Sequence, residues 1–242
     1  MTDPSRLAHL RIRTRDALRP WGRRTLFLIG GLLVGAAAVL MAILADRAQH
    51  EFHQLLGISR YLSLVLTPFG FGLIVFLTLK VFPNSQGSGI PQVIAARELP
   101  DGPTRTALVS LRVAVGKIVA VTLGLFFGAS IGREGPTVQV GAAIMYAMGR
   151  RAMEYQRGLL LAGAAAGIAA AFNTPLAGIV FGIEELSRSF ESRTSGLVLG
   201  AIIAAGLTSL GLVGDYTYFG STAAVLPLGR AWLVVLERSR RR

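Results

Sequence analysis

Long apolar runs separated by short polar stretches dominate the sequence from residue 25 onward. The first run, residues 25–45, is uncharged and is long enough to cross a bilayer core of roughly 30 Å as a helix. Further apolar runs span residues 61–82, 105–131, 136–148, 158–183, 194–214 and 231–236. This pattern predicts an all-α polytopic membrane protein.

Several of the predicted helices are short or are interrupted by glycine and proline. Turn residues occupy positions 83–91, and a short helix is expected to start near Pro91. The run 136–148 is too short to cross the membrane alone, and the run 158–183 is broken at residues 173–175. Broken helices survive at membrane depth only where protein or a water-filled cavity surrounds them. Such interruptions are typical of transporter binding sites.

Pairs of glycines four residues apart recur along the apolar runs. This spacing predicts close packing of helices, because small residues let helix backbones approach each other in lipid. The pairs are Gly31/Gly35, Gly128/Gly132, Gly163/Gly167, Gly178/Gly182 and Gly196/Gly200.

The composition supports a membrane protein and argues against several enzyme classes. Only 16% of the 242 residues are charged, against roughly 25% in an average soluble domain. The absence of cysteine excludes disulfides and thiolate metal sites. The three histidines, His9, His50 and His53, all lie early in the chain, so we predict no His-based catalytic cluster and no metal site.

The formal net charge of +12 is concentrated near the ends and in short loops. Seven arginines precede the first apolar run: Arg6, Arg11, Arg13, Arg15, Arg19, Arg23 and Arg24. An excess of arginine beside a membrane span marks the cytoplasmic side, so residues 1–24 are predicted to be a basic cytoplasmic segment. An arm at the membrane surface is favoured over a nucleic-acid-binding segment. The run 25–45 exceeds the 7–15 apolar residues of a cleaved signal peptide and is therefore expected to remain as a span.

Glu134 is an acidic residue inside a membrane-embedded stretch, in the run Gly132-Arg133-Glu134-Gly135-Pro136. A charge at that depth is costly and usually functional. Gly135 gives the backbone conformational freedom, and Pro136 suits the first position of a helix. The first-turn N–H groups of that helix attract anions, so the carboxylate can compete with a free anion for one place. The alternative is a loop carboxylate paired with Arg133.

The run Gly87-Ser88-Gly89-Ile90-Pro91 places a hydroxyl between two glycines, just before a predicted helix. Backbone N–H groups and the Ser88 O–H can hold a small anion by partial charges alone, and an anion held in this way can leave quickly. A plain turn is the alternative. A nucleophilic serine would need a base, and no histidine lies in the later part of the chain. A membrane hydrolase is therefore a remote alternative, and we predict no enzyme activity.

Glu184 and Glu185 directly follow an apolar run and lie near the end of a helix expected to start at Pro175. A carboxylate pair at that position can receive protons from bulk water, which is consistent with a proton relay. The alternative is that the pair ends an interfacial helix and forms ion pairs with Arg188.

Together these motifs resemble those of the CLC family of chloride channels and chloride/proton antiporters. The resemblance rests on GSGIP at residues 87–91, GREGP at residues 132–136 and the run from residue 163 through Glu185. The three motifs occur in the family's order, and the match covers most of residues 25–230. It implies the first half of an inverted-repeat fold, with broken and partly re-entrant helices.

The resemblance also implies a role for each site residue. Ser88 matches the serine that coordinates the central anion and goes with chloride preference. Glu134 matches the gating glutamate, whose carboxylate occupies the outer anion site and carries the proton. Glu185 matches the internal proton glutamate of the antiporters, and Glu184 matches its neighbour on the intracellular water route. Lys117 matches a buried lysine that adds positive potential near the pathway.

Acidic residues at both Glu134 and Glu185 favour chloride/proton exchange over the alternative, a passive voltage-gated chloride channel. The resemblance implies chloride and protons as substrates, no cofactor, and a homodimer with a separate pore in each subunit. We expect a multi-pass protein of a bacterial inner membrane with a cytoplasmic N-terminus.

One departure from the family pattern is that the second-half Gly-x-Phe-x-Pro motif and a later tyrosine are missing from the sequence. We expect residues 25–236 to form the transmembrane CLC-type domain. Residues 237–242 are expected to be a charged tail, read as a truncation or frameshift end. A non-transporting fragment is therefore a third functional alternative.

Overall fold

The structure, a computed structural model, describes residues 4–59, 61–150, 155–184 and 195–214, with the backbone alone for residues 4–20 and 195. Its elements are α1 (Pro4–Ile58), α2 (Leu62–Phe76), a π-helical turn (Leu77–Val81), α3 (Ile90–Glu98), α4 (Pro103–Leu108), α5 (Leu111–Phe126), α6 (Glu134–Met148), α7 (Gln156–Ala171), α8 (Pro175–Glu184) and α9 (Ser195–Val213). Every regular element in these ranges is helical, which confirms the predicted all-α class.

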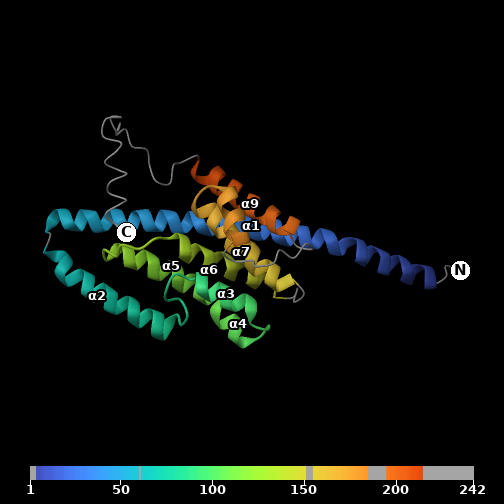
Figure 1. Ribbon diagram of the computed structural model, residues 1–242, viewed down its shortest axis with the longest axis horizontal. Helices are drawn as coiled ribbons and strands as arrows, with labels where there is room; N and C mark the ends of the chain where they lie inside the picture. The colour runs from blue at the N-terminus through green and yellow to red at the C-terminus, as the bar shows by residue number, and fades with distance from the viewer. Residues whose placement is uncertain (1–3, 60, 151–154, 185–194, 215–242) are drawn as a thin grey trace, which may run out of the picture.

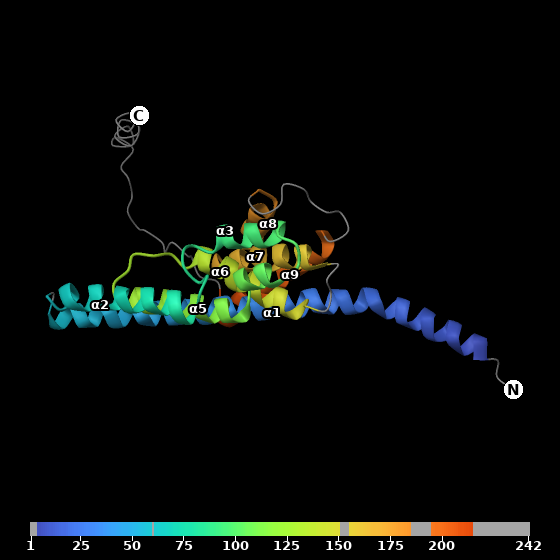
Figure 2. The same cartoon turned by 90° about the horizontal axis from the view of Figure 1, so that it is seen from below.

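α7 lies at the centre of the molecule. It contacts α1, α6, α8 and α9, and every residue from 158 to 171 is buried. α1 runs along the whole assembly, and α9 packs on its middle part (Figure 1). α5 lies beside both α1 and α6, and α2 lies at the far end from the N-terminus (Figures 1 and 2).

Within the described residues, four helical stretches are long and apolar enough to cross a membrane: Trp21–Ile58, Leu62–Val81, Pro103–Phe126 and Gly196–Val213. The polar stretch between the first two apolar runs is helical, because α1 continues without a break to Ile58. The stretch predicted as one helix over residues 105–131 is divided into α4 and α5, with extended backbone at Ser110. The Ser110 side chain accepts a hydrogen bond from the Val113 N–H and so caps α5.

The short and broken helices are found where the sequence predicted them. α3 begins one residue before Pro91, α6 has only 15 residues, and α7 and α8 are separated by the break at residues 172–174. Asn173 in that break has a positive φ of 55°. The run predicted at residues 231–236, the tail at 237–242, and Glu185 with Arg188 lie outside the described residues.

The glycine pairs divide into those that pack and those that do not. Gly31 and Gly35 lie against the α9 backbone, where a Cβ on Gly35 would be 2.7 Å from the Ala205 carbonyl oxygen. Gly163 and Gly167 lie against α6, and Gly178 and Gly182 lie against α7. The packing prediction is wrong for the other two pairs. Gly128 and Gly132 are not in a helix, and Gly196 and Gly200 face open space and a single side-chain atom of Leu28.

Candidate anion site

The Ser88 loop and the start of α6 are in direct contact. A Cβ added to Gly135, in the first turn of α6, would lie 3.0 Å from the Ser88 carbonyl oxygen and 3.2 Å from the Ser88 Cβ. Gly89, the residue before α3, would place a Cβ 3.2 Å from the Gly135 carbonyl oxygen. The structure therefore brings together the two glycine-rich motifs that the sequence singled out, so that α3 and α6 begin side by side.

Glycine is needed in the Ser88 loop for its backbone conformation. Gly87 and Gly89 have φ values of +73° and +101°, in the left-handed region that side chains disfavour. Gly135 is different: it is not among the positive-φ glycines and lies inside α6. The prediction that Gly135 supplies unusual backbone freedom is therefore wrong, and the close approach of Ser88 explains a glycine there. Pro136 is the third residue of α6 rather than the first.

Lys117 holds the Ser88 loop in place through its backbone. Its ammonium group donates hydrogen bonds to the backbone carbonyls of Gln86, at 3.2 Å, and Gly87, at 3.0 Å. The side chain comes from the middle of α5 and is only 1% exposed. Lys117 thus places a buried positive charge within two residues of Ser88, next to the proposed anion position.

Gln139 is a site residue that the sequence reasoning missed. It is fully buried in the second turn of α6, and its side-chain NH2 donates to the carbonyls of Asn84, at 3.2 Å, and Leu108, at 2.9 Å. A Cβ on Gly89 would lie 3.0 Å from the Gln139 Oε1. Gln139 therefore ties the start of the Ser88 loop to α6. The available signal was an amide residue inside an otherwise apolar helix.

Glu134 is the first residue of α6 and is half-buried. Its carboxylate folds back over Gly132, where any Cβ would collide with the Glu134 Oε2. Negative charge is favoured at this end of a helix, where the backbone N–H groups of the first turn have no helical partner. The carboxylate thus lies beside the helix start that would also attract an anion.

Arg133 is engaged elsewhere. Its Nη1 lies 3.0 Å from the Asp46 carboxylate of α1 and donates to the Ala42 carbonyl at 3.3 Å. No ion pair joins Arg133 to Glu134 among the described residues, so the structure does not support that alternative. Arg133 instead attaches the loop before α6 to α1.

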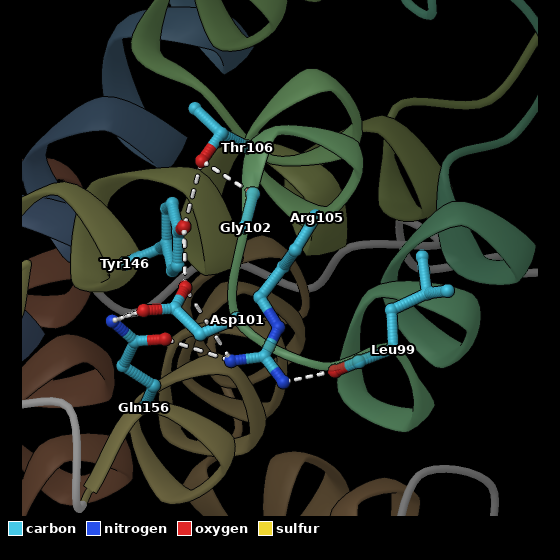
Figure 3. Close-up of polar contacts among 7 residues, drawn as sticks. All are labelled: Leu99, Asp101, Gly102, Arg105, Thr106, Tyr146 and Gln156. Carbon is cyan, nitrogen blue, oxygen red and sulfur yellow. Dashed lines mark hydrogen bonds and ion pairs between the residues drawn. The ribbon is translucent and has the colours of Figure 1, made fainter.

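A second polar cluster holds the segment after α3 against α6 and α7 (Figure 3). Arg105 is 3% exposed and donates to the Gln156 Oε1 at 2.7 Å and to the Leu99 carbonyl. Asp101 accepts hydrogen bonds from the Tyr146 O–H and the Gln156 side-chain NH2, each at 3.2 Å. The sequence reasoning missed this cluster, because its members are scattered over more than fifty residues. The cluster fixes the connection between α3 and α4, and Ser88 lies just before the start of α3.

Glu184 ends α8 and is exposed, at the edge of an otherwise largely apolar cavity of about 670 Å³ that also includes Phe172 and Leu176. Glu185 is outside the described residues, so the structure gives no geometry for the predicted glutamate pair.

Residues 70–236 match the family model described as "Voltage gated chloride channel". That range is more than half of the chain and includes the Ser88 loop, Lys117 and Glu134. The protein belongs to this family. Its relatives include the H(+)/Cl(-) exchange transporters ClcA of Yersinia pestis (strain Angola) and Yersinia pseudotuberculosis serotype O:3 (strain YPIII), each 32% identical over 235 residues.

Solved structures of CLC-type proteins have the same fold. A slow cyanobacterial Cl⁻/H⁺ antiporter is 27% identical, with a TM-score of 0.73 over 88% of this chain. A CLC-type fluoride/proton antiporter is 25% identical, with a TM-score of 0.64. The chain spans about half the length of these proteins: 47% of the ClcA relatives, and 52% and 53% of the two structures.

Proposed function

We propose that the protein transports chloride across the membrane in exchange for protons. The observation that carries the proposal is the contact between the Ser88 loop and the start of α6, immediately beside Glu134. The ClcA relatives, which are named as H(+)/Cl(-) exchange transporters, support the same choice of substrates.

The helix starts support anion binding by partial charges. α3 begins at Ile90 and α6 at Glu134, so the first-turn N–H groups of both helices lie close to Ser88. Helix starts attract anions, and partial charges hold them weakly enough for release. Lys117 gives its described hydrogen bonds to two carbonyls, so it acts on the anion through its field and by holding the loop.

Glu134 is proposed as the gate and proton carrier. When ionised, its carboxylate occupies the anion-attracting end of α6, and when protonated it moves aside so that chloride enters. Glu185 is proposed to pass the proton inward with Glu184 on the water route. We also propose a homodimer in a bacterial inner membrane, with a cytoplasmic N-terminus that follows the excess of arginine before the first span.

Flux measurements in liposomes test this function. The native-length protein is reconstituted, a chloride gradient is imposed, and chloride efflux and proton uptake are recorded together. We expect proton movement coupled to chloride in the wild type and its loss in Glu134→Gln, with chloride flux retained. Coupled proton movement that is unchanged in Glu134→Gln would exclude Glu134 as the gate.

The competing function is a passive chloride channel. A channel gives chloride flux whose reversal potential ignores a pH gradient, whereas an exchanger's reversal potential shifts with it. A reversal potential that is independent of pH would therefore show that the protein is a passive chloride channel rather than an exchanger. Glu185→Gln separately tests the inner relay, because persistent proton coupling in that variant would remove Glu185 from the proton route.

A further inference from the structure

A cavity of about 490 Å³ lies between the start of the first membrane span in α1 and the first turns of α9. Two arginines, Arg23 and Arg24, line it together with the apolar Phe27 and Leu28 from α1. α9 contributes Gly196 and Gly200. Positive charge and apolar wall therefore meet in one cavity, which has no part in the proposed anion site.

The cavity is open because the Gly196/Gly200 pair does not pack against another helix. A Cβ on Gly196 would meet nothing within 4 Å, and one on Gly200 would meet only the Leu28 Cδ2, at 3.7 Å. The tightly packed pair Gly31/Gly35 joins the same two helices further along α1. The helices α1 and α9 are thus closely packed at one level and leave space at the level of the arginines.

The charged end of the cavity has donors available for an anion. Arg23 donates one N–H to the Tyr155 hydroxyl at 2.8 Å and stacks 5.1 Å above that ring, which fixes the guanidinium. Arg24 is exposed and lies 5.8 Å from the Trp21 ring. Gly196 adds the first turn of α9, whose N–H groups attract phosphate.

The position along α1 places this charge at the membrane surface. Arg23 and Arg24 directly precede the uncharged apolar run of residues 25–45. Trp21, just before them, is 67% exposed, and tryptophan is enriched where the bilayer meets water. The arginines therefore lie at the level of lipid headgroups, and Phe27 and Leu28 lie one turn deeper.

We propose that this cavity binds an anionic phospholipid. Arg23, Arg24 and the start of α9 hold the phosphate, and an acyl chain lies over Leu28 and the smooth glycine surface of α9. A free phosphate would use only the charged end, whereas a lipid matches both the charge and the apolar wall.

Native mass spectrometry of the purified protein tests the site, with phosphatidylglycerol titrated against phosphatidylcholine of the same acyl chains. We expect preferential binding of phosphatidylglycerol. Arg24→Gln should weaken it about fivefold, because a basic residue near an anionic surface contributes on that order. Arg47→Gln removes another exposed arginine of α1, outside the cavity, and should leave binding unchanged. Gly200→Leu and Gly196→Leu fill the apolar part and should also weaken binding, whereas Gly211→Leu should not.

The proposal requires that lipid binding weaken both when Arg24 loses its charge and when leucine fills the cavity. If Arg24→Gln and Arg47→Gln lost phosphatidylglycerol binding equally, the lipid preference would depend on net charge alone, and the proposal would be overturned. Unchanged binding in both cavity-filling variants would also overturn it. Displacement of the lipid by inorganic phosphate at equal concentration would identify a free-anion site instead.

Discussion

At the scale of single residues, the candidate anion site depends on where side chains are small. Ser88 approaches the backbone of α6 only because residue 135 has no Cβ. The charged residues beside the site are used in different ways. Lys117 holds the loop, Arg133 holds the segment before α6 through Asp46, and Glu134 lies at the start of α6 itself. Glu134 is thus the acidic residue at the start of α6, while Lys117 and Arg133 position the backbone around it.

Gly135→Ala should weaken chloride binding about tenfold. The new Cβ would be 3.0 Å from the Ser88 carbonyl oxygen and would push the loop away. Overpacking costs about 1–3 kcal/mol, and about 1.4 kcal/mol is tenfold in affinity. Isothermal titration calorimetry measures the effect. Gly211→Ala is the matched control, because a Cβ there meets nothing within 4 Å. Equal affinities in the two variants would show that the Ser88 contact does not shape the site.

Lys117→Met should lower both chloride affinity and stability. The substitution leaves the Gln86 and Gly87 carbonyls without their donor and removes the buried charge. A buried polar group left unsatisfied costs about 1–3 kcal/mol. Thermal unfolding and chloride titration report the two effects. The exposed Lys80 provides the control Lys80→Met. If Lys117→Met matched that control in both assays, the loop would not need the lysine.

At the scale of helices, the α6–α7 contact positions the site. Gly141 and Gly163 meet backbone to backbone, so a Cβ on either would collide with the carbonyl of the other. α6 carries Glu134 and Gln139, and α7 is the buried centre of the molecule. Any separation of these helices therefore moves the start of α6 relative to the Ser88 loop.

Gly141→Ala should destabilise the protein by about 1–3 kcal/mol, because neither helix backbone can yield without repacking. The same change at the exposed Gly211 should be neutral or stabilising, since alanine is a better helix former than glycine by up to about 1 kcal/mol. Denaturation midpoints of the two variants give the comparison. A Gly141→Ala protein as stable as Gly211→Ala would contradict the close packing of α6 and α7.

The elements were predictable where local chemistry decides them. Proline and glycine mark the starts of α3 and α8, and the lengths of the apolar runs give α2, α7 and α9. The polar residues after residue 45 continue α1 as a helix, because charged side chains are tolerated on an exposed helical surface. Gln139 and the Asp101–Arg105 cluster were not predictable, because their partners come from distant parts of the chain.

At the scale of the whole molecule, the candidate spans in α1 and α9 pack on the buried α7, whereas the candidate span in α2 packs beside α5. α2 is mostly exposed, and its outward residues are apolar, such as Leu64, Val65 and Phe69. Apolar surface of this kind suits contact with lipid or with further protein. The two motifs of the site, in contrast, lie against each other, with Ser88 exposed and Glu134 half-buried.

The central claim is that chloride and the Glu134 carboxylate compete for the same helix start. Chloride affinity measured by calorimetry over a range of pH tests it most directly. Protonation removes the competing charge, so affinity should rise as the pH falls in the wild type. In Glu134→Gln the affinity should be high and independent of pH. A wild type whose affinity ignores pH, or a Glu134→Gln protein that keeps the wild-type pH dependence, would contradict the account.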